Sequence, residues 1–212
     1  MICRLFRAKY LIFLGIIAAA PSPRVFGALV QSRQDSAVTL DNGLLRITMD
    51  DNSGKFSAQL AGGKKNIFSA AFEKPAGVTA VTEVSNSLGK GAALVFSGAE
   101  AAAVHIALYD GLPFVFIRQD LKNSTAQLKT IDQVVPARLN IDEGKPLAQV
   151  RTLGCDGLKA GTEPRASYMF LAAADPASRS GVVAGWITSQ RGSGIVLSRS
   201  EGDALTVEAR SE

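Results

Sequence analysis

Residues 103–121 read AVHIALYDGLPFVFIRQDL, and this stretch decides the fold class. Apolar residues alternate with others over residues 103–109, Asp110-Gly111 has the composition of a hairpin turn, and residues 114–121 are rich in β-branched and aromatic side chains. Alternation with a period of two places successive side chains on opposite faces of a strand. The stretch therefore predicts a β-hairpin, with His105 on the more polar of its two faces.

The same pattern recurs along the chain. Two alternating segments, residues 44–49 and 55–60, flank the turn sequence of residues 50–54, DDNSG. Further short strands are expected at residues 78–84, 92–96, 182–188, 195–198 and 205–209. No segment longer than about ten residues has a clear helical period. Short strands separated by glycine and Asx turns are typical of an all-β sandwich, in this case one of about a dozen antiparallel strands.

Two parts of the chain depart from this regularity. Residues 128–141 look extended, and Pro136 predicts either a sheet edge or a bulge there, because proline donates no backbone hydrogen bond. Residues 140–165 form the loosest part, with four glycines and two prolines. We expect a long loop over one sheet at this point, and loops of that length are often functional.

The first 27 residues have the order of a secretory signal peptide. A basic start is followed by the apolar residues 10–20, by Pro21 and Pro23, and by small residues at the positions that a signal peptidase reads before a cut after Gly27. The apolar run is shorter than the roughly 20 residues that span a bilayer, although an uncleaved anchor is an alternative interpretation. We therefore expect a signal peptide over 1–27, a β-sandwich domain over 28–212, and an exported chain in the periplasm or outside the cell.

Removal of the leader changes the charge and cysteine counts. The full chain has 23 basic and 19 acidic residues, and the leader holds four basic residues and no acid, so 23 − 4 = 19 basic residues balance 19 acidic ones. A net charge near zero argues against nucleic acid as a partner and against binding to a membrane surface. Cys155 is the only cysteine after Gly27, so this fold depends on its core and not on an intrachain disulfide.

Residues 151–158, RTLGCDGL, place Cys155 beside Asp156 between two glycines. A nucleophilic cysteine needs a nearby base, and His105 is the only histidine in the chain. A Cys155–His105 dyad is therefore one interpretation, and a loop cysteine with an unrelated surface histidine is the other, which the sequence favours. Zinc needs about four Cys or His ligands, and residues 50–54 have a calcium-loop composition without its spacing. We expect neither a metal nor a cofactor.

Three residues are candidates for binding a substrate, and none is a candidate for catalysis. Asp156 and Glu163 bracket the loose part of the chain, where paired carboxylates for glycosidic chemistry and solvated loop acids are both possible interpretations. Trp186 is the sole tryptophan and fits either the core or an exposed platform for sugar stacking, with the core favoured. Arg191 belongs to the polar run that follows its strand. The candidates are thus Asp156, Trp186 and Arg191.

Several blocks of the chain resemble a known family. DNGLLRITMDDNSGKFSAQ, residues 41–59, resembles the first hairpin of the β-supersandwich that opens many bacterial glycoside hydrolases. TLGCDGL (152–158), SYMFLAAADPASRSGVVAGWITSQRGSGIVLSR (167–199) and EGDALTVEAR (201–210) resemble the N-terminal domain of α-galactosidase-like, melibiase-type enzymes. The resemblance runs from about residue 39 to residue 210, and the second group of blocks is the more distinctive.

This resemblance implies a β-supersandwich that precedes a catalytic (β/α)₈ barrel. The barrel of such enzymes carries the aspartate nucleophile and the aspartate acid/base, and no residue of this chain matches either role. It also implies a carbohydrate partner, bound through the barrel, with the loop of residues 154–157 beside the sugar pocket. Family members often have tryptophans in that loop, and this chain has none there. We expect an inactive accessory domain cut before its barrel; a stand-alone carbohydrate-binding module and an envelope structural protein are the alternatives.

Overall fold

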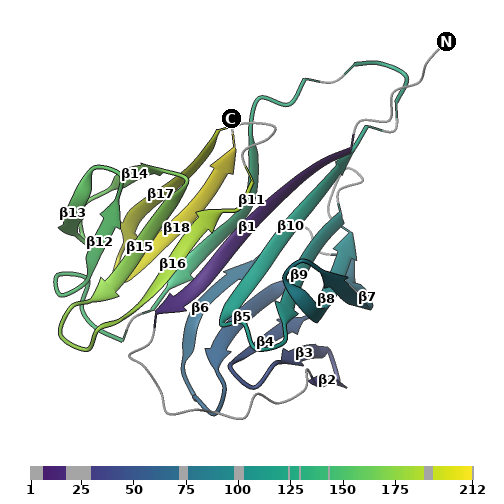
Figure 1. Ribbon diagram of the computed structural model, residues 1–212, viewed down its shortest axis with the longest axis horizontal. Helices are drawn as coiled ribbons and strands as arrows, with labels where there is room; N and C mark the ends of the chain where they lie inside the picture. Colours follow the sequence, from purple (N-terminus) through teal and green to yellow (C-terminus); the bar gives the residue numbers. More distant parts are fainter. Residues whose placement is uncertain are drawn as a thin grey trace.

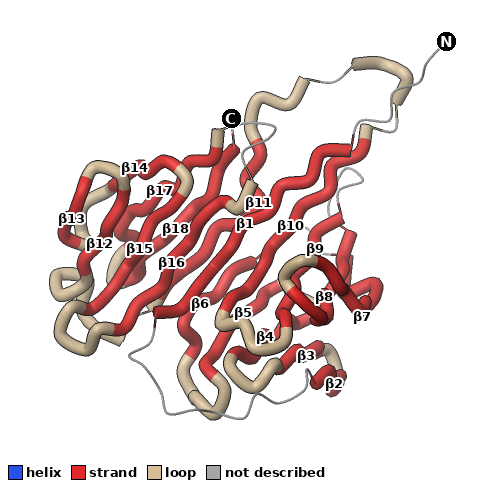
Figure 2. Tube along the Cα trace, in the orientation of Figure 1, coloured by secondary structure: helices blue, strands red, loops and turns tan. Residues whose placement is uncertain are grey.

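The structure is a computed structural model that describes residues 7–17, 30–71, 76–97, 103–123, 125–128, 130–142, 144–188 and 193–211. The described residues form two nine-stranded sheets, and every strand pairs antiparallel to its neighbours (Figure 1). Figure 2 shows strands and connecting loops throughout this part of the chain. The all-β sandwich predicted from the alternating pattern is therefore confirmed, with more strands than the expected dozen.

The strands of each sheet follow one another in a spatial order that differs from their order in the chain. Sheet A consists of β13 (Gly157–Ala160), β12 (Arg151–Gly154), β15 (Phe170–Asp175), β16 (Ser180–Trp186), β1 (Arg7–Ile17), β10 (Phe114–Lys122), β9 (Ala103–Tyr109), β8 (Gly89–Ser97) and β7 (Ala76–Asn86). Sheet B consists of β14 (Arg165–Tyr168), β17 (Gly194–Glu201), β18 (Ala204–Ser211), β11 (Val134–Ile141), β6 (Asn66–Ala71), β5 (Lys55–Leu60), β4 (Leu45–Asp50), β3 (Ala37–Asp41) and β2 (Val30–Gln34).

The predicted hairpins form where the local pattern placed them. Strands β9 and β10 pair around the Asp110-Gly111 turn, and β4 and β5 pair around residues 50–54. Gly54 has a φ of +62°, a backbone conformation that costs a glycine little, which explains its place at the end of that turn. Pro136 coincides with a register shift between β11 and β18, so of the two predicted alternatives the bulge is observed.

One main core fills the space between the sheets. Sheet B contributes the large buried side chains Leu40, Leu45, Ile47, Phe56 and Phe68, and sheet A contributes Leu94, Phe96, Ile106, Leu108 and Ile117. The two sets come from alternate positions of their strands, as burial of one strand face requires. A smaller cluster around Tyr109 and Phe116 lies on the opposite face of sheet A. Tyr109 lies on the same strand face as His105, so this second cluster buries part of the face that was predicted to be the more polar one.

The expected long loop over residues 140–165 is wrong. This stretch contains β12 and β13 and leads directly into β14. The three strands are four residues long, which is too short to establish a visible alternation. The glycines at positions 154 and 157 are the last register pair of a hairpin, and Cys155 and Asp156 form its two-residue turn.

Strand β1 lies within the segment predicted to be a signal peptide. Residues 7–17 run between β10 and β16 in sheet A, where Figure 1 shows β1 as the purple arrow at the centre of the sheet. The predicted cleavage position after Gly27 lies outside the described residues. The full chain therefore uses its apolar N-terminal segment as a central strand.

Candidate functional site

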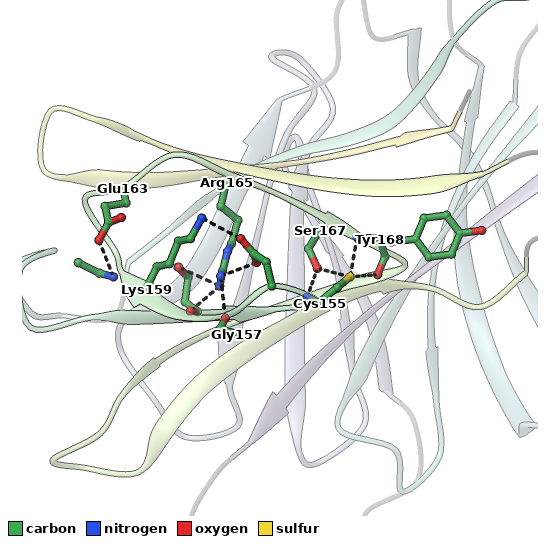
Figure 3. A network of polar contacts seen from close by, with 10 residues as sticks. Cys155, Gly157, Lys159, Glu163, Arg165, Ser167 and Tyr168 are labelled. Atoms are coloured by element: carbon green, nitrogen blue, oxygen red, sulfur yellow. Dashed lines mark hydrogen bonds and ion pairs between the residues drawn. The ribbon is translucent and has the colours of Figure 1, made fainter.

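The β12–β13 turn holds two of the residues that the sequence singled out. Gly157 has a φ of +95°, a conformation that L residues with a side chain rarely adopt. Residue 154 must be a glycine for another reason, because a Cβ at this position would lie 2.5 Å from the Oγ of Ser167. Gly157 therefore serves the backbone conformation of the turn, and Gly154 serves the close approach of the hairpin to β14. They aim Cys155 and Asp156 at that strand, which belongs to the other sheet (Figure 3).

Asp156 accepts from two cations. The Nζ of Lys159 lies 2.7 Å from one of its carboxylate oxygens, and a guanidinium nitrogen of Arg165 lies 2.6 Å from the other. The hydrogen bond from Lys159 outweighs desolvation and, with the charges of Arg165 and Lys159, holds the pKa of Asp156 below its usual value. Since 45% of the Asp156 side chain is still exposed, the turn presents a fixed, ionised carboxylate to solvent.

Arg165 is the buried anchor of this turn. Its side chain points inward from β14 and is fully shielded from solvent. The guanidinium donates to the main-chain oxygens of Thr152 (2.5 Å) and Gly157 (2.6 Å) as well as to Asp156. These hydrogen bonds from the two terminal guanidinium nitrogens offset the cost of burying the charge, while the buried Nε has no hydrogen-bond partner. The contacts of Arg165 therefore fix the β12–β13 hairpin of sheet A against β14, an edge strand of sheet B (Figure 3).

Cys155 is held by hydrogen bonds to the same strand. Its sulfur accepts the N–H of Tyr168 at 3.0 Å and lies 3.2 Å from the Oγ of Ser167, while its own N–H donates to that Oγ at 3.0 Å. His105 lies on β9, five strand positions from β12 in sheet A. At about 4.8 Å per position the separation is about 24 Å. The Cys155–His105 dyad does not form, and the structure supports a positional role for this thiol.

Trp186 and Glu163 are not part of this two-residue turn. Trp186 belongs to the main core, 7% exposed, and its indole N–H donates to the main-chain oxygen of Ile195 at 3.2 Å. Its ring is thus a core side chain and not the exposed platform that sugar stacking needs. Glu163 accepts the N–H of Ala160 at 3.3 Å, which closes the turn after β13. Arg191 lies outside the described residues.

A groove on the outer face of sheet B was not predicted. It measures about 390 Å³ and runs along β14, β17 and β18, with Leu197, Arg199, Thr206, Glu208 and Arg210 among its lining residues. The signal was present in the sequence. Thr206, Glu208 and Arg210 alternate with Leu205, Val207 and Ala209 of the core, so the polar members of this strand share one face.

Glu208 is the central charge of this groove. Its side chain is only 8% exposed and bridges Arg138 on β11, at 2.6 Å, and Arg210 on its own strand, at 2.8 Å. Burial raises the pKa of Glu208, but the hydrogen bonds from Arg210 and Arg138 outweigh it and leave the pKa below its usual value. The groove floor therefore has an ionised carboxylate with two guanidinium groups beside it, a set that donates to and accepts from hydroxyl groups.

With this geometry in view, comparisons with protein-family models, curated proteins and solved structures found no match. In the part of the chain that the structure describes, no three His, Cys, Asp or Glu side chains gather as metal ligands. No helix in that same part is long and apolar enough to cross a membrane.

Proposed function

We propose that this chain is an exported β-sandwich domain that accompanies the catalytic barrel of an α-galactosidase-like glycoside hydrolase. The observation that supports this role best is Asp156, an ionised carboxylate fixed at the tip of the β12–β13 hairpin. The turn is the part that the sequence resemblance places beside the sugar pocket. A carboxylate accepts hydrogen bonds from sugar hydroxyls, and a support that fixes its position removes the ordering cost of binding.

The barrel and its two aspartates belong to another polypeptide segment in this proposal. The domain stabilises the barrel and closes one side of its pocket, with the hairpin turn as the contributing surface. Lys159 and Arg165 hold the Asp156 carboxylate in place, so Asp156 is the substrate-contacting residue and Arg165 is a positioning residue. Cys155 has no role in the chemistry.

The test compares Asp156→Asn with the unaltered chain. The hydrolase that contains this chain is purified from source cells in the unaltered and the Asp156→Asn form. The rate of hydrolysis of aryl α-galactosides is then measured for both. Loss of a charged hydrogen bond to the substrate corresponds to about 1.5–3 kcal/mol, so KM is expected to rise about tenfold or more. Asp203→Asn, at the exposed β17–β18 turn, is the matched control and leaves KM unchanged. Hydrolysis by residues 1–212 alone, lost in Asp156→Asn, would contradict the proposal.

A second candidate function is that of a carbohydrate-binding module, and the groove on sheet B favours it. Its arginine and carboxylate side chains offer both donors and acceptors to sugar hydroxyls. In this case the chain binds oligosaccharides without a barrel. Calorimetric titration of the full chain with galactosides measures this directly, and Arg199→Ala, a variant of an exposed groove residue, weakens the binding. Saturation at millimolar sugar that is unaffected by Arg199→Ala rules out the groove as the site.

A further inference from the structure

Strand β1 connects two strands that would otherwise face each other across a gap. Its residues 7–15 pair with β10, and its residues 12–17 pair with β16. In the described part of the chain, β10 and β16 have no pairing with one another. Figure 1 shows the same arrangement, with β1 between the two. Without β1, sheet A would hold an eleven-residue slot, which we call the β1 slot, with a backbone edge along each side.

Around residues 12–14 of β1, both faces of the β1 slot are apolar, whereas residues 7–11 pair with the more polar half of β10. On the core side, Ile117 of β10 is fully buried and Ala184 of β16 is 2% exposed. On the outer side, Phe116 of β10 is 3% exposed. Residue 13 of β1 pairs with Phe116 on one side and with Gly185 of β16 on the other, so Phe116 and Gly185 lie opposite each other across the slot. A strand that is covered on both faces is a nearly continuous apolar run and not an alternating one. The sequence of β1, RAKYLIFLGII, has this composition after its two basic residues.

The same residues form the apolar part of the predicted leader. Cleavage after Gly27 removes β1 from the chain. The N–H and C=O groups of β10 and β16 that β1 satisfied then need another partner, because unpaired backbone groups in an apolar slot cost free energy. Export and an intact sheet A are therefore compatible only if the β1 slot closes or is filled again.

Closure by direct pairing of β10 with β16 is unfavourable. Both strands are antiparallel to β1, so they run parallel to each other. They are two strand spacings apart, about 9.6 Å, and one half of sheet A would have to move by about 4.8 Å. Ile117 and Ala184 lie on the two halves and pack in the same core against sheet B, which opposes that movement. A second mature copy has the same gap and no spare apolar strand in the described part of its sheets.

We propose that the β1 slot of the mature chain binds, by strand addition, an extended apolar segment of a different polypeptide, antiparallel to both β10 and β16. The segment spans about nine to eleven residues, contains no proline, and carries apolar side chains on both faces where it pairs with Val115, Phe116 and Ile117 of β10. In the full chain β1 occupies this place, and it protects the two edges from edge-to-edge association. The inference rests on the removal of residues 1–27 and is independent of any sugar.

The experiment begins with the full chain, in which the slot is filled. A protease recognition sequence is placed between residues 20 and 27, the folded chain is cut, and size-exclusion chromatography shows whether the N-terminal fragment stays bound. The probe is a labelled peptide of residues 7–17 with two added lysines. Its matched control is the same peptide with Phe13→Pro, which removes an amide at a position paired with both neighbouring strands.

The expected result is that the cut fragment stays bound and exchanges with the labelled peptide, while the Phe13→Pro peptide binds at least tenfold more weakly. Removal of the fragment without a replacement peptide empties the slot, which raises hydrogen exchange in β10 and β16 and leaves the β4–β5 hairpin unchanged. Release of the fragment with unaltered exchange in β10 and β16 would overturn the proposal, since the slot would then be closed. N-terminal sequencing that finds residues 1–27 on the exported chain would overturn it as well.

Discussion

Arg165 of sheet B binds Asp156 of sheet A, with 2.6 Å between a guanidinium nitrogen and a carboxylate oxygen. The side chain of Arg165 is fully shielded from solvent, whereas the side chain of Asp156 is 45% exposed. One end of this ion pair therefore belongs to the sandwich interior and the other to the surface. The ion pair therefore holds the exposed carboxylate, which we propose contacts a sugar, in a position fixed by the buried Arg165.

Substitution of Arg165 by methionine tests this anchor. Arg165→Met keeps the unbranched apolar stem of the side chain and removes the guanidinium with its hydrogen bonds to Thr152, Asp156 and Gly157. The freed Asp156 rehydrates, so the expected loss in the free energy of unfolding is about 2–3 kcal/mol, below the value for a pair buried at both ends. Urea denaturation measures it. Lys159→Met, which removes the exposed partner of Asp156, is the control and has a much smaller effect. Equal losses in the two variants would show that Arg165 is no anchor.

Glu208 gives a prediction for the pH dependence of stability. Its pKa in the folded chain is lower than its usual value, despite burial, because Arg210 and Arg138 donate to it. A depressed folded pKa contributes stability that is present above the unfolded pKa and is lost as the pH falls through the folded pKa. The unaltered chain therefore loses more stability than Glu208→Gln between about pH 5 and pH 3.

The measurement for Glu208 is the free energy of unfolding at a series of pH values for both chains. Asp50, Asp142, Asp156 and Asp175 also have pKa values below their usual range, and they contribute equally to both curves. The difference between the curves thus isolates Glu208. Parallel curves over the acid range would mean that the carboxylate has no net interaction with Arg138 and Arg210.

The sequence predicted the parts of this fold that depend on neighbours along the chain. The β9–β10 hairpin follows from alternation and an Asp-Gly turn, and residues 104, 106 and 108 are buried as that alternation requires. Strands β12, β13 and β14 were missed because four residues do not establish a period. The place of β1 was missed because the same apolar composition is typical of a leader and of a strand buried on both faces.

The candidate site was only partly predictable for a related reason. Asp156 stood out because glycines flank it, but its anchor Arg165 reaches it from the other sheet, and no local pattern shows such a contact. Trp186 illustrates the opposite case. Its alternating strand is compatible with either face, and only the packing of sheet B beneath it places the ring in the core. Glu208 carried a readable signal in the alternation of residues 204–211.

The packing of Trp186 leads to a prediction about Gly194. A Cβ at residue 194 would lie well inside van der Waals contact with the indole ring, so Gly194→Ala forces the ring to move. Overpacking of this kind costs about 1–3 kcal/mol. Trp186 is the sole tryptophan, so its emission reports the change directly. We expect blue-shifted emission and weak acrylamide quenching in the unaltered chain, and stronger quenching in Gly194→Ala. Ser193→Ala, at the exposed neighbour, changes neither; strong quenching of the unaltered chain would place the ring at the surface.

Substitutions at Cys155 distinguish a positional role of its sulfur from a chemical one. Its sulfur accepts the N–H of Tyr168 and lies within hydrogen-bond reach of Ser167, which ties the β12–β13 turn to β14. A serine hydroxyl keeps both functions, so Cys155→Ser should leave the free energy of unfolding within about 0.5 kcal/mol of the unaltered chain. Cys155→Ala removes the acceptor and should cost about 0.5–1.5 kcal/mol. Thermal and urea unfolding of both variants measure the difference. If Cys155→Ser abolished glycoside hydrolysis by the assembled enzyme with folding intact, the thiol would have a chemical function that this geometry does not provide.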